Sequence, residues 1–196
     1  MKVKGFILPL LFVVFLCSCK EKENKQEPKS VAYPFIERAG NKLVEYENKE
    51  LSFSISDAAI VKPVDNKDKT GVWFDIVYPQ YKATIYCSYL PITKATFYDA
   101  VEDSYKLAFS HASIADGIKQ TAYVNKERQT SGIVYEIDGG VAVPIQFFVT
   151  DSVSNFFRGS LYYDTLVNPD SVAPVTAYLL EDIVTMIESL EWKPKH

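Results

Sequence analysis

Few residues of this sequence have the types and spacing that enzyme chemistry needs. The chain contains two histidines, His111 and His196, and His196 is its last residue. The sequence holds neither a His-Glu-x-x-His zinc motif nor a Cys-x-x-Cys pair. The glycines of Asp138-Gly139-Gly140 lie between two predicted strands, which is typical of a hairpin turn rather than of a phosphate-binding loop. The sequence therefore predicts neither a metal ion nor a cofactor.

A cysteine nucleophile would have to be Cys87 acting with His111. Cys87 shares a predicted strand face with Ile85 and Tyr89, and a free cysteine in such a run is usually a small buried hydrophobe. A reactive thiol needs an electropositive and accessible setting, and Lys82 is the only basic residue nearby in the sequence. His111 ends a predicted helix, where packing or a favourable interaction with the helix dipole is more common than general-base chemistry. We therefore predict no catalytic residue.

The strongest chemical signal is a lipid-attachment site at Cys19. Two lysines precede an apolar run over residues 6–16, which is the pattern of a bacterial secretory signal and is too short for a membrane-spanning helix. In Leu16-Cys17-Ser18-Cys19 a large aliphatic residue stands three positions before Cys19, and a small residue stands directly before it. This spacing resembles the lipobox of bacterial lipoproteins. Cys17 does not fit, because the bulky Leu16 precedes it.

Cleavage before Cys19 would divide the chain into three parts. Residues 1–18 would be a discarded signal peptide, and Cys19 would carry three acyl chains, which anchor a protein permanently in a membrane. Residues 19–30 contain no large apolar side chain and predict a flexible tether. Residues 31–196 would form a single globular domain without an internal disulfide, because Cys87 is its only cysteine. The alternative is a plain secreted protein whose cysteines lie in a discarded signal.

The composition describes one globular domain and limits its partners. Of the 196 residues, 47% are hydrophobic, 14% aromatic and 23% charged, which is too apolar for a disordered chain. Lysine and arginine number 21 against 25 acidic residues, so the formal net charge is −4. Such a charge gives no general attraction for phosphates, and we predict no nucleic-acid partner. Contact with a membrane is expected through the lipid anchor.

The hydrophobic pattern changes between strand and helix periods along the domain. Apolar residues recur at three and four positions over 96–111 and 171–190, which predicts two amphipathic helices. Pro174 favours a start of the second helix at Ser171, because an earlier start would place the proline in the helix interior. Residues 63–71 predict a polar loop. Alternation with a period of two predicts seven strands, at residues 51–55, 72–78, 83–89, 118–124, 133–137, 141–150 and 156–164.

The links between these strands predict their arrangement. A turn at residues 79–81 joins the second and third strands in a hairpin, and short turn-like links join the last four strands in an antiparallel meander. The order β-β-β-α-β-β-β-β-α predicts an α+β domain, in which two helices pack on an antiparallel sheet.

Aromatic residues are concentrated in the last two predicted strands. One interpretation is a dense aromatic core, because a sheet that is covered on both faces carries many large side chains. The other is a protein-binding face, because tyrosine, phenylalanine and arginine are enriched at interfaces. The candidate residues for such a face are Phe148, Phe156, Arg158 and Tyr162.

Several segments from Tyr78 onward have a specific residue pattern. The first two are Tyr78–Tyr86 (YPQYKATIY) and Glu102–Leu107 (EDSYKL) with His111. The others are Pro144–Ser152 (PIQFFVTDS), Phe157–Tyr162 (FRGSLY) and the stretch from Asn168-Pro169-Asp170-Ser171 through Glu181-Asp182-Ile183. Together these segments resemble the GldD family of gliding-motility lipoproteins of the Bacteroidota. The order of sheet and helices also resembles the Mog1/PsbP-like α-β-α sandwich, an analogy of fold alone.

The GldD resemblance implies a non-catalytic lipoprotein of the cell envelope, anchored at the outer membrane and facing the periplasm. It implies a role in gliding motility and type IX protein secretion, with other envelope lipoproteins or with secretion and motility proteins as partners. The preferred hypothesis is thus a scaffold or accessory module that binds protein. The alternative is an envelope enzyme or small-ligand binder that uses a pocket between sheet and helix.

Overall fold

The computed structural model describes residues 36–65, 70–164 and 169–194. These residues belong to one compact unit, Tyr33–His196. The predicted signal peptide, Cys19 and the predicted tether lie outside the described residues. The chain folds as an α+β domain with two helices and antiparallel sheets, which confirms the predicted fold class.

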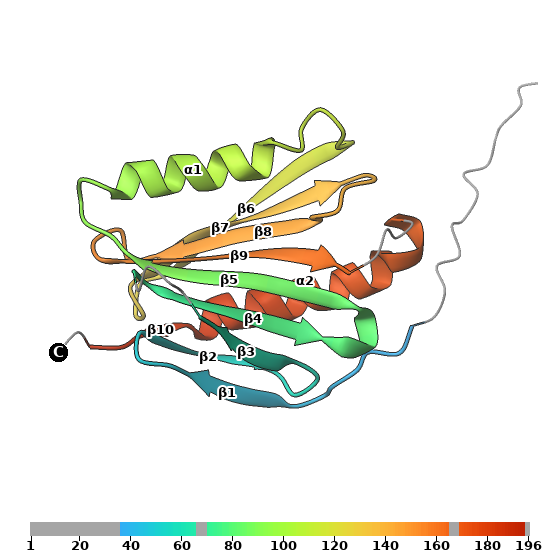
Figure 1. Ribbon diagram of the computed structural model, residues 1–196, viewed down its shortest axis with the longest axis horizontal. Coiled ribbons are helices and arrows are strands. Elements are labelled where there is room, and N and C mark those ends of the chain that lie inside the picture. Colours follow the sequence, from blue (N-terminus) through green and yellow to red (C-terminus); the bar gives the residue numbers. More distant parts are fainter. Residues whose placement is uncertain (1–35, 66–69, 165–168, 195–196) are drawn as a thin grey trace, which may run out of the picture. The chain divides into compact units, whose positions relative to one another are not determined.

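A seven-stranded antiparallel sheet, the large sheet, is the centre of the domain (Figure 1). Its strands, in spatial order, are β3 (Ile60–Val64), β4 (Val72–Tyr78), β5 (Ala83–Pro91), β9 (Asn155–Tyr163), β8 (Ile145–Thr150), β7 (Thr130–Asp138) and β6 (Gly117–Asn125). A short 3-10 helix, η1 (Pro79–Tyr81), joins β4 to β5 in the predicted hairpin. Strands β6 to β9 form the predicted meander, and the pairing of β5 with β9 joins the two halves.

One face of the large sheet is covered by helix α2 (Pro169–Ser189) and by a small second sheet. The small sheet consists of β1 (Leu43–Glu47), β2 (Leu51–Ser56) and β10 (Glu191–Trp192). Alternate residues of the strands meet apolar residues of α2 in one core. The α2 residues of this core, with Leu190 directly after the helix, recur at three and four positions and are at most 4% exposed: Val175, Leu179, Ile183, Met186, Ile187 and Leu190.

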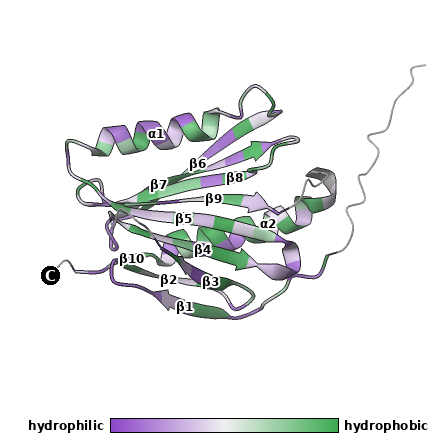
Figure 2. Ribbon diagram, in the orientation of Figure 1, coloured by the Kyte–Doolittle hydropathy of each residue, from purple (hydrophilic) through white to green (hydrophobic). Residues whose placement is uncertain are grey.

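Helix α1 (Phe97–Phe109) packs on the opposite face of the large sheet. It covers a smaller core in which Ala108 of the helix meets Tyr135, Phe148 and Phe156 of the sheet. Figure 1 shows α1 beside the β6–β9 half of the sheet and away from β3, β4 and β5. Hydrophobic and hydrophilic residues are interspersed along α1, as expected for a helix with one buried side (Figure 2).

The sequence pattern misses three strands and misplaces several boundaries. It predicts none of β1, β3 and β10, and it places part of β3 in a polar loop. β8 begins at Ile145 rather than at Val141. Helix α2 begins at Pro169, so Pro174 lies inside it, beyond the first turn. The apolar stripe of α2 on the core outweighs the lost backbone hydrogen bond at this position.

The first described residues are fixed onto α2 by contacts that we call the N-terminal latch. The Arg38 guanidinium donates to the Asp182 carboxylate at 2.6 Å and also pairs with Glu181. The Tyr178 hydroxyl donates to the carbonyl of Ile36 at 3.0 Å, and the Arg38 guanidinium lies over the Tyr178 ring. Asp182 is 5% exposed, so the latch joins the N-terminal segment to a buried charge on α2.

The buried Asp182 of the latch predicts how the stability of the domain depends on pH. Burial raises the pKa of Asp182 above its ordinary value of 3.8, and the hydrogen bond and charge of Arg38 offset only part of this rise. The folded state thus holds this proton more tightly than the unfolded state does. Asp182 therefore contributes stability that is complete below pH 3.8 and is lost as the pH rises through its folded-state pKa.

We therefore expect the melting temperature of Asp182→Asn, relative to wild type, to increase as the pH is raised through this window. Thermal unfolding of both proteins by circular dichroism at a series of pH values measures this difference. A difference that stays constant or decreases with rising pH would contradict the assignment.

Candidate protein-binding face

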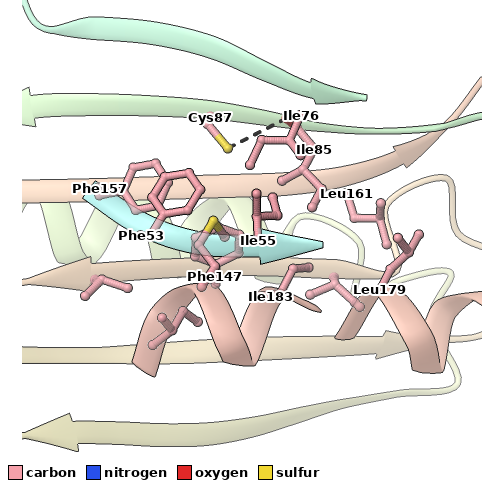
Figure 3. Close-up of a cluster of buried hydrophobic side chains, with 14 of the residues drawn as sticks. Phe53, Ile55, Ile76, Ile85, Cys87, Phe147, Phe157, Leu161, Leu179 and Ile183 are labelled. Atoms are coloured by element: carbon pink, nitrogen blue, oxygen red, sulfur yellow. Dashed lines mark hydrogen bonds between the residues drawn. The ribbon is translucent and has the colours of Figure 1, made fainter. Parts of the chain in front are cut away.

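Cys87 lies in the main core and not in a reactive setting. Its side chain is 3% exposed and packs among the apolar residues of β4, β5 and β9 (Figure 3). The thiol donates to the carbonyl of Ile85 at 3.7 Å, and burial raises its pKa well above the ordinary value. This confirms the predicted burial of Cys87.

We expect the folded protein to leave Cys87 unmodified by iodoacetamide at neutral pH, because the thiolate is both inaccessible and disfavoured. Cys87→Ser should lower the free energy of unfolding by about 1–3 kcal/mol, the cost of burying a poorly paired hydroxyl. Mass spectrometry of native and denatured protein after alkylation measures the first effect, and denaturant unfolding the second. Rapid modification of native protein would contradict this prediction.

His111 does not approach Cys87. It follows α1, which covers one face of the large sheet, whereas Cys87 points into the core on the other face. Within the described ranges, no group of three or more histidine, cysteine, aspartate or glutamate residues could hold a metal ion. Asp151 has a structural task, because its carboxylate accepts backbone hydrogen bonds from Val153, Ser154 and Asn155 in the turn between β8 and β9.

A cavity of about 260 Å³ lies between α2 and the ends of β7 and β8. Its described walls are largely aliphatic, and none of the described lining residues is a histidine or cysteine. The Glu136 carboxylate at its rim pairs with Lys119 at 2.6 Å. The Tyr163 and Thr176 hydroxyls, also in the wall, bond to each other at 2.6 Å. Typical ligand sites have volumes of about 300–1,000 Å³, and this cavity is smaller.

The four candidate interface residues divide into two pairs. Phe148 and Phe156 are 4% and 1% exposed and stack on each other beneath α1, with ring centroids 5.2 Å apart. They belong to the core, in agreement with the first interpretation of the aromatic residues, and are removed from the candidate face. Arg158 and Tyr162 lie on the same side of the sheet but outside this core, and Tyr162 is 38% exposed.

The cross-strand register shows which residues surround this second pair. One row across the sheet places Trp73, Ser88 and Arg158 opposite one another, and it continues to Phe148 under α1. The next row places Asp75 opposite Tyr86 and Tyr86 opposite Ser160. Residues opposite one another point to the same side of a sheet. We call this region the open face, with the residues Trp73, Asp75, Tyr86, Ser88, Arg158, Ser160 and Tyr162.

Two tyrosines dominate the surface of the open face. The Tyr86 and Tyr162 rings meet edge to face, with centroids 5.3 Å apart, and Tyr86 is 50% exposed. An open depression is lined by these tyrosines together with Trp73, Arg158 and the serines of the two rows. The region thus combines exposed aromatic rings, hydroxyl groups and one half-buried cation.

Arg158 is the unusual member of the open face. Its side chain is half-buried, yet it makes no hydrogen bond or ion pair with any residue in the described part of the chain. Burial lowers the pKa of Arg158, and the charge of Asp103 on α1 opposes this shift. The guanidinium remains charged at physiological pH. A cation that is partly removed from water without a partner is costly, which marks this position as one that an anion would stabilise.

Trp73 and Tyr86 are not among the predicted candidates. The signal that could have found them is their position in the rows, because they share a sheet side with Arg158 and Tyr162 once β5 is paired with β9. The sequence alone does not indicate that pairing.

Helices in the described ranges are all too short or too polar to cross a membrane.

Comparison with known proteins identifies the family. The model of the family described as gliding motility lipoprotein GldD matches residues 23–192. Comparison with curated proteins gives no significant match. The solution structure of cyanobacterial PsbP (CyanoP) from Synechocystis sp. PCC 6803 is similar to this chain at 15% identity, with a TM-score of 0.46, over 77% of this chain and 92% of that one. The family match covers most of the sequence, and this chain therefore belongs to the GldD family of gliding-motility lipoproteins.

Proposed function

We propose that this protein is a non-catalytic accessory component of gliding motility and type IX protein secretion, held at the periplasmic face of the outer membrane by lipids on Cys19. It binds other envelope lipoproteins or secretion and motility proteins through the open face. The observation that carries the protein-binding part is the group of exposed aromatic residues around Arg158, outside both cores. Family membership supports the motility part.

The residue types of the open face are those of protein interfaces. Tyrosine, tryptophan and arginine are enriched in interface centres and supply much of the binding energy. The aromatic side chains bury a large area with little loss of side-chain freedom. Single exposed apolar residues occur on any protein surface. The open face instead gathers Trp73, Tyr86 and Tyr162 around one cation.

A tether that starts at Cys19 sets how far the domain reaches from a lipid surface. Seventeen positions separate Cys19 from Ile36, which allows at most about 60 Å when fully extended. The domain can therefore meet partners in a layer near the membrane and does not need to touch the lipid.

Lipidation at Cys19 has a direct test. In cells fed labelled palmitate, we expect Cys19→Ala to accumulate as an unprocessed, unlabelled precursor, because no thiol then stands at the cleavage position. Cys17→Ala is the matched control and should be labelled and processed like wild type. Label on the Cys19→Ala protein, or its loss from the Cys17→Ala protein, would contradict the assignment.

The role in motility is tested by complementation. A gliding strain of the Bacteroidota that lacks its own family member is given this chain, and colony spreading and type IX cargo in the medium are measured. We expect wild type to restore both, since the family match covers most of the chain. Restoration of neither, with the protein present in the envelope, would contradict the proposal.

The alternative of an envelope enzyme or small-ligand binder has less support. The cavity beside α2 is small and largely aliphatic. Of the two carboxylates in its described wall, Glu136 and Asp138, Glu136 is already paired with Lys119. The described residues bring no histidine or cysteine to that cavity.

A further inference from the structure

The open face supports an inference about the chemistry of the partner protein that it binds. This inference rests on the proposed function. Arg158 stands where the covered half of the large sheet meets the uncovered half. Phe148, its neighbour on β8, lies beneath α1, whereas Ser88, its neighbour on β5, lies in the open depression. The partly buried Arg158 side chain therefore lies at the border between the two halves and lines the depression.

The groups around Arg158 suit a planar anion. A guanidinium presents a fixed fork of N–H donors that matches the two oxygens of a carboxylate. Ser88 and Ser160 add hydroxyl donors to the same depression, and Trp73, Tyr86 and Tyr162 add aromatic walls. Arg158 has no carboxylate within ion-pairing distance among the described residues.

The charges nearby decide which kind of anion fits. Asp103 on α1 acts on Arg158 through its charge, and Asp75 lies in the adjacent row of the open face. Lys62 on β3, the strand next to Asp75, offsets that aspartate. One free arginine between two carboxylates does not attract a doubly charged phosphate or an anionic lipid surface strongly. It does suit a single carboxylate whose flanking atoms are apolar.

We infer that the open face binds an aspartate or glutamate side chain in a segment of a partner protein. The Arg158 guanidinium is the anchor for the carboxylate, and the rings of Trp73, Tyr86 and Tyr162 pack against the apolar residues on either side of it. Arg158 thus sets specificity for an acidic segment, and the aromatic rings supply contact area.

The test uses two synthetic peptides, acetyl-Phe-Glu-Phe-amide and acetyl-Phe-Gln-Phe-amide, titrated into the isotope-labelled protein and followed by NMR. We expect the glutamate peptide to shift the signals of the Trp73 indole, the Arg158 side chain and the amides of Ser88 and Ser160. The glutamine peptide should bind at least about tenfold more weakly, the ratio that a charged hydrogen bond provides. Inorganic phosphate, titrated in parallel, should bind more weakly than the glutamate peptide.

Variants separate this role from a structural one. Arg158→Gln and Arg158→Lys should each weaken binding of the glutamate peptide at least about tenfold, because lysine lacks the planar fork. Lys126→Gln removes an exposed cation from the turn between β6 and β7 and should bind like wild type. Arg158→Gln should melt at or above the wild-type temperature, because it removes a partly buried charge that has no partner.

Four results would overturn the inference: equal binding of the two peptides, tighter binding of phosphate, shifts confined to other parts of the domain, or no binding of the glutamate peptide. The complementation assay distinguishes this failure from failure of the proposed function. If wild type and Arg158→Gln restore gliding equally, the result supports the proposed function and contradicts the carboxylate site. If wild type does not restore gliding, the result contradicts the proposed function, whatever the peptides show.

Discussion

Ile183→Ala is expected to lower the free energy of unfolding by about 2–5 kcal/mol. Ile183 is fully buried at the middle of α2 and belongs to the core shared by α2, the small sheet and the large sheet. Removing its side chain leaves a cavity whose walls are two sheets and a helix, and such walls cannot easily move together. Urea unfolding followed by circular dichroism measures the loss as a lower midpoint with an unchanged slope.

Glu188→Ala is the matched control, because Glu188 is exposed on the same helix. It should change stability by no more than about 0.5 kcal/mol. A chain that ends before Pro169 loses the whole helix and should fail to fold, because one face of the large sheet is then open to water. If Ile183→Ala unfolds like Glu188→Ala, or the shortened chain melts like the full one, α2 is peripheral.

The second large effect is expected from Gly132→Ala. Gly132 lies in β7 between Tyr123 of β6 and Val149 of β8. A Cβ atom at this position would overlap the backbone carbonyl oxygen of Phe148 and approach the Val149 Cα to 3.2 Å. A backbone atom inside a sheet cannot move aside without breaking the strand pairing. We therefore expect a loss of about 3 kcal/mol or more, at or above the upper end of the usual cost of overpacking.

Gly140→Ala provides the comparison for Gly132→Ala. At Gly140 a Cβ atom would meet no heavy atom within 4 Å, and the residue does not have a positive φ. Alanine there should leave stability unchanged or raise it by up to about 1 kcal/mol, because it restricts the unfolded chain. Thermal unfolding of the two variants tests the pair. Similar melting temperatures would show that β7 and β8 can separate locally to admit the methyl group.

Elements with one buried face could be predicted from the sequence. Phe74, Ile76 and Tyr78 alternate with less buried residues along β4, and the apolar stripe of α2 has helical spacing. Strand β1 has no such signal, because four of its five side chains are exposed. Strand β3 contains Pro63, and a proline in the sequence favours the prediction of a loop. A proline is tolerated in β3 because this strand pairs only with β4, at the edge of the sheet.

The candidate face could be predicted only in part. Aromatic and arginine residues gather in β9, which indicates Arg158 and Tyr162, but Phe148 and Phe156 are aromatic too and are buried. What separates the two pairs is the position of α1, which covers one half of the sheet and leaves the other open. That position depends on long-range packing. The pairing of Ser88 with Arg158, 70 positions apart in the sequence, is equally invisible to local patterns.

The N-terminal latch has a mechanical consequence. A pull that arrives along the chain at Ile36 acts first on the bond from the Tyr178 hydroxyl to the Ile36 carbonyl. It then acts on the bonds from Arg38 to Asp182 and from the Ala39 amide to the Tyr81 hydroxyl. These bonds tie the segment to α2 and to η1, so they share the load at several points. Without them, tension would reach β1 directly and could peel it from β2 one hydrogen bond at a time. Tension from the N-terminal side is therefore passed to α2 and η1 before it reaches the pairing of β1 with β2.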